Sequence, residues 1–442
     1  MPDPQPMSNR QRKIMERQAE RNREMAAAKR SDTRTPFREA ELQFLSRHPP
    51  PDYSKALDFR QPVEVLLRDP KIKTVPLRKR ISEFSNLFGV KDSQQEGGDL
   101  PENAYLHEDH PGLIYIPAAF TPAAQRNLIK GCLKDYSRHP NKSNLDTHYL
   151  VPDSGLWDLH ENVFTGKQSS DDPSIFVQRK AKVDEQAGGY GSDDDDDDDN
   201  ASKPDNKRPK MKPKSPVPSV RTLVPIMDGT PNVPDNVPKD DPEPSAQVPI
   251  LPPAQLVRKM RWITLGYQYH WPSKTYHFDQ NAPFPEELSI LSKAVVDAVD
   301  GVGPYPYPAD DFVAEAGVVN YYQLKDRLMG HVDRSELNKK APLVSFSFGH
   351  SCVYLLGGPT REKEPTPILL QSGDILVMTG PCRSAFHGVP RIIENTLPTY
   401  LQSRPEEPEW DIYADYLSEA RINLNIRQVY PPKDSPASPV QH

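Results

Sequence analysis

The sequence predicts a mainly β core, a sandwich or barrel, with flanking helices and disordered insertions. Two observations lead to this prediction. Six short strand-like runs follow residue 316 and are separated by glycine and proline, which is typical of an all-β sandwich or barrel. The composition also limits the size of the core: the 442 residues include 50 prolines, about twice the average share, and only 36% are apolar. Much of the chain is therefore expected to remain disordered.

Residues 1–104 are expected to form a basic, partly disordered arm with short helices. The segment 8–30 favours helix but lacks an apolar stripe, so it is either a solvated helix or a basic arm that touches nucleic acid or a partner. The run FREAELQFL at 37–45 could dock as a short helix. Residues 105–165 are expected to begin the folded domain, with a strand at 112–120 and a helix at 122–136 that starts after Thr121, a typical capping residue.

Residues 166–254 read as a disordered insertion rich in Ser, Pro, Asp and Lys. Seven aspartates, Asp193 to Asp199, account for the whole formal net charge, since −7 + 7 = 0. The tract KRPKMKPK at 207–214 is either a nuclear-import signal or a solvated charged segment. We expect a nuclear or cytoplasmic protein, because Glu16, Glu20 and Glu24 disfavour a mitochondrial transit peptide.

Two features of the composition exclude broad classes. The three cysteines are widely spaced, which suits a reducing compartment rather than a disulfide framework. No run of 18 apolar residues exists, so no membrane span is expected. We expect a monomer.

Residues 255–430 are expected to hold the core, followed by a disordered tail at 431–442. The aromatic-rich run 261–271 predicts a strand pair or hairpin, and 285–299 predicts an amphipathic helix. The six strand-like runs lie at 316–322, 342–349, 351–358, 365–371, 373–380 and 421–430. A helix at 410–420 precedes the last of them. In that strand, RINLNIR, period-two alternation places Arg421, Asn423 and Arg427 on one face.

Three His-x-Asp pairs compete as candidate metal sites. Two histidines and one carboxylate on one face can hold Fe(II) and leave positions open for substrate and oxygen. His107-x-Asp109 precedes the first clear strand, and His277-x-Asp279 is followed mostly by helix and a Pro-rich loop, so we interpret both as loops. His331-x-Asp333 precedes four strands, after which His387 and the Arg421 strand follow. A jelly-roll barrel can bring such distant residues together.

At these residues the chain resembles the AlkB family of Fe(II)- and 2-oxoglutarate-dependent dioxygenases. The resemblance covers roughly 105–165 and 255–430 and is greatest toward the eukaryotic AlkB homologue 1 subgroup. It implies a double-stranded β-helix, or jelly-roll, fold, with Fe(II), 2-oxoglutarate and O2 as cofactor and cosubstrates. The matching pieces are Asn320-x-Tyr322, His331-x-Asp333, SFSFG at 345–349, SGD at 372–374, His387 and Arg421-x-Asn423-x-x-x-Arg427, with Arg383 as a further match.

The resemblance also implies roles for these residues. His331, Asp333 and His387 would ligate the iron. Arg421, helped by Tyr322, would pair with the far carboxylate of 2-oxoglutarate. Asn320, Asn423 and Arg427 would hold its near end and brace the metal ligands. The bacterial prototype has a second acid two residues after the ligand aspartate; here Ser335 stands there, with Glu336 beside it.

The activity that the resemblance implies is oxidation of methyl groups on nucleobases, in tRNA or in single-stranded or unpaired DNA, because the base must be accessible to reach the iron. Trp262, Tyr267 and Tyr269 are candidates for a wall that stacks the base, and Ser335 and Glu336 for residues that read it. Two alternatives remain open. One is an oxygenase that acts on a protein side chain, and the other is a non-catalytic jelly-roll binding module.

Overall fold

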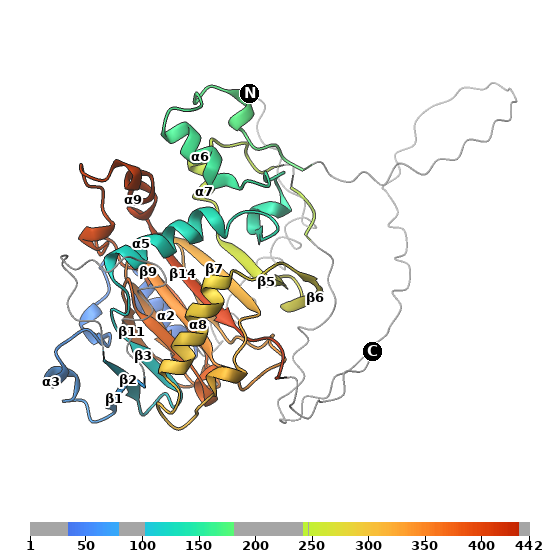
Figure 1. The fold of residues 1–442 in the computed structure, drawn as a ribbon. Helices are drawn as coiled ribbons and strands as arrows, with labels where there is room; N and C mark the ends of the chain where they lie inside the picture. The colour runs from blue at the N-terminus through green and yellow to red at the C-terminus, as the bar shows by residue number, and fades with distance from the viewer. Residues whose placement is uncertain (1–33, 79–101, 181–241, 246, 433–442) are drawn as a thin grey trace, which may run out of the picture.

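Two antiparallel sheets form the centre of the structure, a computed structural model that describes residues 34–78, 102–180, 242–245 and 247–432 (Figure 1). The larger sheet has ten strands in the order β1-β2-β3-β12-β9-β14-β7-β5-β4, with β6 paired to β5. The smaller sheet has the order β11-β10-β13-β8. The predicted mainly β core with flanking helices is confirmed, and its two facing sheets form the jelly-roll.

The bounds of the strands are as follows. The larger sheet contains β1 (Ile72–Pro76), β2 (Asn103–His107), β3 (Leu113–Ile116), β4 (Lys142–Ser143), β5 (Trp262–His270), β6 (Thr275–Asn281), β7 (Ala316–Gln323), β9 (Leu343–Gly349), β12 (Ile375–Met378) and β14 (Ala420–Arg427). The smaller sheet contains β8 (Leu328–His331), β10 (Cys352–Leu356), β11 (Thr366–Leu370) and β13 (His387–Ile392).

Helices cover the outer faces of both sheets. The α-helices are α2 (Pro36–Leu45), α3 (Val63–Leu66), α5 (Pro122–Lys130), α6 (Leu156–Phe164), α7 (Pro253–Val257), α8 (Glu286–Ala298) and α9 (Asp411–Leu417). Helix α5 begins as predicted, with the Thr121 side chain accepting a hydrogen bond from the Ala124 N–H and Pro122 in the first turn. Among the described residues, no helix combines the length and apolar character needed to cross a membrane.

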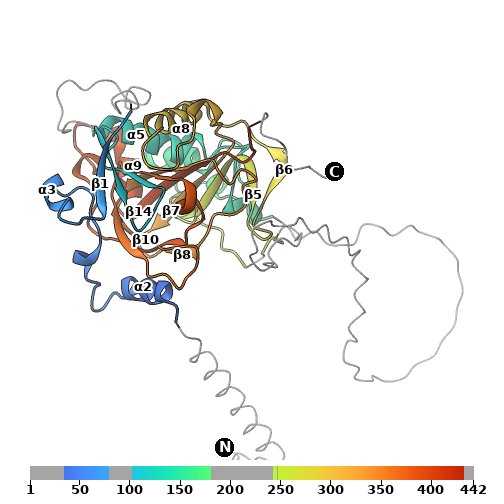
Figure 2. The same cartoon turned by 90° about the horizontal axis from the view of Figure 1, so that it is seen from below.

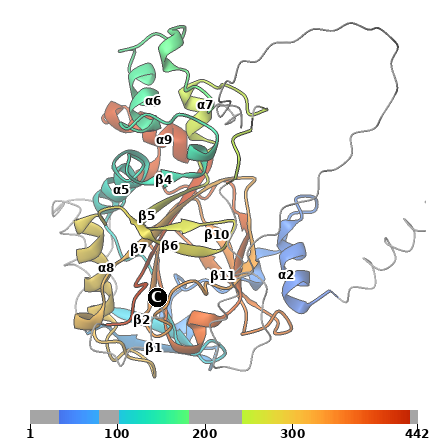
Figure 3. The same cartoon turned by 90° about the vertical axis from the view of Figure 1, so that its right-hand side faces the viewer.

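The two faces of the larger sheet are chemically different. Helices α5 and α8 lie against its outer face, while the smaller sheet and α2 lie on the other side (Figures 1 and 3). Strand β14 shows the division: Ile422, Leu424 and Ile426 belong to the main apolar core with residues of α5 and α8. The alternate side chains of β14 are polar and face the smaller sheet, so the functional residues line the space between the sheets.

The folded domain begins earlier than residue 105. Strand β1 pairs with β2 along its whole length, from Ile72 opposite His107 to Pro76 opposite Asn103. Helix α2 buries Phe37 and Phe44 against Val353 and Leu355 of the smaller sheet, and Figure 2 shows it beside β8 and β10. The predicted helix at 37–45 is thus confirmed as α2, and residues 34–78 are part of the domain. The segment 8–30 lies outside the described residues.

Part of the predicted insertion also packs onto the domain. Ile175 and Val177 are buried, and Tyr149 forms a β-bridge with Arg179. At the far end of the insertion, Val248 and Leu251 pack against the main apolar core, and Pro253 is buried at the start of helix α7. The prediction of disorder across 166–254 therefore does not hold for its two ends, because each carries apolar residues that fill the core. The aspartate run, the basic tract at 207–214 and the tail from residue 433 lie outside the described residues.

The predicted hairpin at 261–271 is wrong in its bounds. Residues 262–270 form one strand, β5, and the hairpin is completed by β6. The sequence of β6, TYHFDQN, is mostly polar, so it carries little apolar alternation. Strands β8 and β13, which hold the two candidate histidine ligands, were likewise not predicted, because both are short and polar or glycine-containing.

Burial of His160 makes the free energy of unfolding depend on pH. Burial, with His160 only 4% exposed and packed against Trp157 and Phe164, lowers the pKa of His160 from 6.5 to about 4. The unfolded chain then binds more protons than the folded chain between these values, so stability is present above pH 6.5 and is lost as the pH falls toward 4. As the pH falls from 7 to 5, we expect the free energy of unfolding of His160→Leu to decrease by about 2 kcal/mol less than that of the wild type. Urea unfolding at both pH values measures this difference. An equal loss in both proteins would contradict the assignment.

Candidate metal and cosubstrate site

Three side chains converge between the sheets at one end of β8 and β13. His331 ends β8 and His387 begins β13, and the two are register partners, with ring centroids 4.4 Å apart. Asp333 Oδ1 lies 3.7 Å from His331 Nε2, and its Oδ2 lies 3.7 Å from His387 Nε2. Among the described residues, this is the only group of three or more such side chains close enough to share a metal ion. Two imidazoles and one carboxylate, with open positions beyond them, suit Fe(II).

The charge states of two of these side chains also suit a metal. Burial, followed by the nearby His331, lowers the pKa of His387 to about 4, so His387 is neutral at neutral pH and can ligate. Burial alone would raise the pKa of Asp333, but Arg427, followed by the two histidines, outweighs it and holds the pKa well below its usual value. Asp333 is therefore an anion, and it faces the neutral imidazole of His387.

Backbone carbonyls orient both imidazoles. The Nδ1–H of His331 donates to the Met329 carbonyl at 3.0 Å, and that of His387 donates to the Ala385 carbonyl at 3.1 Å. These contacts leave both Nε2 atoms facing Asp333. A hydrogen bond from the second ring nitrogen is typical of metal-binding histidine, since it fixes the ring and its tautomer.

Helix α2 braces the strand that carries His331. Strand β8 is an edge strand, and the N–H of Gly330 donates to Glu41 Oε1 of α2. Arg361 donates to the Gly330 carbonyl at 2.6 Å. A Cβ at Gly330 would meet the ring of Phe37 at 2.4 Å, so only glycine permits this approach. Helix α2, which belongs to the arm expected to be partly disordered, thus supports the backbone next to the candidate ligand His331.

A buried arginine lies deeper between the sheets and has no anionic partner in the described part of the chain. Arg421 is 1% exposed, and its Nη1 donates to the His350 carbonyl at 2.8 Å and its Nη2 to Ser347 Oγ at 2.7 Å. Its Nε has no hydrogen-bond partner, and no carboxylate of the described residues lies within 4 Å of it. A buried cation with only neutral acceptors is costly unless an anion joins it. The site therefore fits the far carboxylate of 2-oxoglutarate.

The other predicted cosubstrate residues share this inner face. Tyr322 lies opposite Arg421 and Asn320 opposite Asn423 in the β7–β14 register. Burial raises the pKa of Tyr322, which stays a neutral phenol. The Asn423 amide instead braces β9, because it donates to Ser345 Oγ and to the Phe346 carbonyl, both at 2.9 Å. Arg427 donates to Asp333 Oδ2 at 2.9 Å and so holds the candidate ligand.

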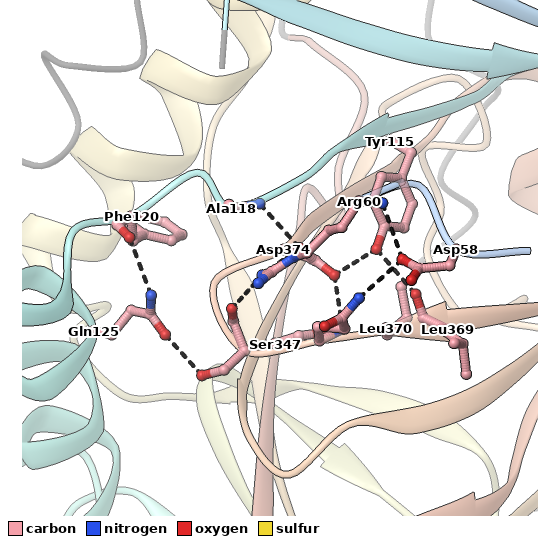
Figure 4. Close-up of polar contacts among 12 residues, drawn as sticks. Asp58, Arg60, Tyr115, Ala118, Phe120, Gln125, Ser347, Leu369, Leu370 and Asp374 are labelled. Carbon is pink, nitrogen blue, oxygen red and sulfur yellow. Dashed lines mark hydrogen bonds and ion pairs between the residues drawn. The ribbon is translucent and has the colours of Figure 1, made fainter. Parts of the chain in front are cut away.

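The motif at 372–374 is structural. Asp374 is buried, and its Oδ1 accepts hydrogen bonds from Arg60 Nη2 at 2.7 Å and from the Ala118 N–H at 2.9 Å (Figure 4). The Tyr115 hydroxyl donates to its other oxygen. This aspartate therefore joins the turn before β12 to the N-terminal segment and to β3, and contacts none of the three candidate ligands.

Two of the three predicted stacking residues, Trp262 and Tyr269, meet at the partly exposed Trp271, and we call the side of the site where these three residues lie the mouth. Trp262 lies opposite Asn320 in register, so both share the inner face. The rings of Trp262 and Tyr269 lie 5.2 Å and 4.8 Å from that of Trp271, which is 39% exposed. Trp271 directly follows β5, within the aromatic run of the sequence, but was not among the predicted residues.

Tyr267 is not brought to this group. Its ring has other partners, Tyr430 at 5.4 Å and Phe278 at 6.2 Å, although Tyr267 and Tyr269 both pack against the cluster that contains Tyr276. The cause is a change of alternation within β5. Gly266 has φ +68°, and the pairing with β6 shifts between Tyr267 and Gln268.

The structure places Glu336, a predicted substrate-reading residue, inside the protein. Glu336 is 2% exposed, its Oε2 lies 2.8 Å from Arg383 Nη2, and its Oε1 accepts a hydrogen bond from the Tyr276 hydroxyl at 3.0 Å. Both oxygens are thus occupied inside the protein. Ser335 is half-buried, and its hydroxyl donates to the Lys274 carbonyl at 2.8 Å, so it contacts the hairpin β5–β6.

Of the two rejected His-x-Asp pairs, the one at 277–279 lies in a strand and the one at 107–109 spans the end of a strand and a turn; among the described residues, neither belongs to a group that could hold a metal. His107 is buried at the end of β2, and Asp109 pairs with Lys71 at 2.7 Å. His277 and Asp279 both lie in β6, 3.8 Å apart. Pairing of β6 with β5 places the second pair in a sheet, whereas Asp109 lies in the turn that follows β2.

Known proteins resemble this chain in the same regions. The family model described as "2OG-Fe(II) oxygenase superfamily" matches residues 236–427. The Mus musculus protein named "Nucleic acid dioxygenase ALKBH1" is 33% identical over 88% of this chain and 82% of its own length. The "tRNA demethylase abh1" of Schizosaccharomyces pombe is 40% identical over 39% of this chain and 54% of its own. The Arabidopsis thaliana "DNA N(6)-methyladenine demethylase ALKBH1A" is 37% identical over 40% of this chain and 50% of its own.

Proposed function

We propose that this chain, which belongs to the AlkB family of Fe(II)- and 2-oxoglutarate-dependent dioxygenases and within it to the ALKBH1 group, oxidises methyl groups on the bases of nucleic acid. One observation supports this proposal most strongly: the candidate metal ligands and a buried arginine lie close together. The His331, Asp333 and His387 group and the unpaired, buried Arg421 line the same space between the sheets. A metal chelate of a dicarboxylate needs both, since one end meets the metal and the other needs a cation.

Each side chain has a separate task in this proposal. His331, Asp333 and His387 hold Fe(II), which with 2-oxoglutarate and O2 supplies the oxidation of the methyl group. Arg421 and Tyr322 bind the far carboxylate of 2-oxoglutarate and so fix how far the cosubstrate enters between the sheets. Arg427 keeps Asp333 ionised and oriented. Asn423 holds β9 in place below the site, and Asn320 lies across from it, toward Trp262 and the mouth.

The aromatic group at the mouth favours a flat, unpaired substrate. Trp262, Tyr269 and Trp271 offer ring faces on which a base can stack, and such stacking tolerates different bases. The names of the relatives include both tRNA and DNA demethylases, so methylated adenine or cytosine in tRNA, or N6-methyladenine in unpaired DNA, are the substrates to test. We further propose a monomer in the nucleus or cytoplasm.

One reaction panel tests this proposal against the two alternatives. The purified full chain is incubated with Fe(II), 2-oxoglutarate and either methylated tRNA, methylated DNA oligonucleotides or a mixture of proteins, and succinate and nucleosides are followed by mass spectrometry. We expect succinate and loss of the methylated nucleoside with nucleic acid. Succinate formed only with proteins would reveal a protein hydroxylase, and absence of turnover with bound iron would reveal a binding module.

A further inference from the structure

Glu336 lies where four segments of the chain meet. It follows the candidate ligand Asp333 by three residues and contacts Arg383 of the 3₁₀ turn Gly380–Ser384. Its Oε1 lies 3.5 Å from Arg427 Nε of β14 and accepts from the Tyr276 hydroxyl of β6. Oε2 is 2.8 Å from Arg383 Nη2, an ion pair without the angles of a good hydrogen bond.

The two arginines that surround Glu336 also hold Asp333. Arg427 Nη2 donates to Asp333 Oδ2 at 2.9 Å, and Arg383 Nη1 donates to the Asp333 backbone carbonyl at 3.2 Å. All four side chains are at most 14% exposed. Two carboxylates and two guanidiniums balance, so the formal charge of the group is zero. Removing one member leaves an uncompensated charge buried away from water. The stability lost is then far greater than when an exposed ion pair is broken.

The group reaches the hairpin β5–β6 through a single tyrosine. The hydroxyl of Tyr276 donates to Glu336 and accepts from Arg427 Nη1 at 3.3 Å. The ring of Tyr276 packs at 5.3 Å against Tyr269, one of the aromatic residues at the mouth. A continuous path of contacts therefore runs from the face where a base would stack to the carboxylate that would ligate the metal.

We propose that Glu336 is a positioning residue for the metal site: it holds Arg383 and Arg427 against Asp333, and Tyr276 connects that group to the hairpin β5–β6. Glu336 thus acts on the metal rather than on the base. The inference rests on the proposed function only in requiring that a divalent metal binds at His331, Asp333 and His387. It makes no use of which nucleic acid is oxidised, so it can fail or hold independently of the substrate.

The test measures metal affinity without nucleic acid. Mn(II) is titrated into the metal-free full-length protein, free Mn(II) is followed by electron paramagnetic resonance, and the signal of bound Mn(II) is recorded. Glu336→Gln keeps the shape and the hydrogen bond from Tyr276 but leaves the two arginines with an excess positive charge. We expect its Kd for Mn(II) to rise about tenfold, which is typical when a residue behind a ligand is changed.

A second variant covers the case in which Glu336→Gln does not fold. Tyr276→Phe keeps every charge and removes one hydroxyl, so we expect its Kd for Mn(II) to rise about threefold, and the double variant to rise by less than the product of the two single effects. All titrations are run below the unfolding temperature of each variant, because a merely structural role would lower that temperature and leave the Kd of folded protein unchanged.

Glu394→Gln is the matched control. Glu394 also pairs with an arginine of β13, Arg391 at 2.8 Å, but takes no part in the group around Asp333. Its variant is expected to bind Mn(II) within twofold of wild type. Wild-type Mn(II) affinity in both Glu336→Gln and Tyr276→Phe, with a change only in the turnover of nucleic acid, would overturn the proposal and return Glu336 to substrate reading.

Discussion

Arg421→Gln is expected to weaken the binding of 2-oxoglutarate by about a hundredfold, since it removes two charge-assisted hydrogen bonds worth about 1.5 kcal/mol each. The reason is the environment of Arg421: it is 1% exposed and contacts only neutral acceptors. The affinity for Mn(II) should stay near that of wild type, because Arg421 contacts none of the candidate ligands. Calorimetric titration of 2-oxoglutarate into the Mn(II)-loaded protein measures the effect.

The thermal stability of the same variant tests independently whether Arg421 is the cation that binds the far carboxylate. Without cosubstrate, Arg421→Gln should unfold at a temperature equal to or above that of wild type, because the change removes a buried charge that has no carboxylate partner among the described residues. Arg391→Gln is the matched control, since Arg391 is also buried but pairs with Glu394. It should bind 2-oxoglutarate normally. Wild-type affinity in Arg421→Gln would show that another residue binds the far carboxylate.

Asp333→Ala is expected to lower turnover by at least about a thousandfold, because it removes a ligand and the anion that neutralises Arg427. The loss should appear in the formation of succinate as well as in the loss of the methyl group. Far-ultraviolet circular dichroism checks that the fold is kept. The control is Asp279→Ala, which alters the exposed aspartate of the His277 pair and should leave turnover unchanged. Residual succinate at the wild-type rate in Asp333→Ala would mean that the metal binds elsewhere.

The candidate metal ligands could be predicted because the sequence indicates the strands and their order. His331 and Asp333 follow a strand, His387 follows another, and the alternation in β14 separates Arg421 from the apolar core residues. Each of these inferences needs only the periodicity of a strand and the order of the strands. The fold class was predictable for the same reason.

The remaining parts of the site depend on pairings between distant segments. Glu336 meets Tyr276 only because a hairpin 60 residues earlier folds over it. Nothing in the sequence near Glu41 indicates that its carboxylate accepts a hydrogen bond from Gly330, 289 residues away. Tyr267 and Tyr269 look equivalent in the sequence, yet the register shifts between Tyr267 and Gln268, and their rings contact different aromatic residues. Register shifts and long-range polar pairs are set by the tertiary structure, and local patterns do not report them.

In the proposed activity, His331, Asp333 and His387 would hold Fe(II), Arg421 would bind 2-oxoglutarate, and a methyl group on a nucleobase would be oxidised. The most direct test counts succinate and demethylated nucleoside in the same reaction, with methylated single-stranded oligonucleotides as substrate and Asp333→Ala and Arg421→Gln beside the wild type. We expect one succinate for each methyl group lost in the wild-type reaction, and neither product in the Asp333→Ala reaction. Methyl loss without succinate, or equal product from wild type and Asp333→Ala, would contradict it.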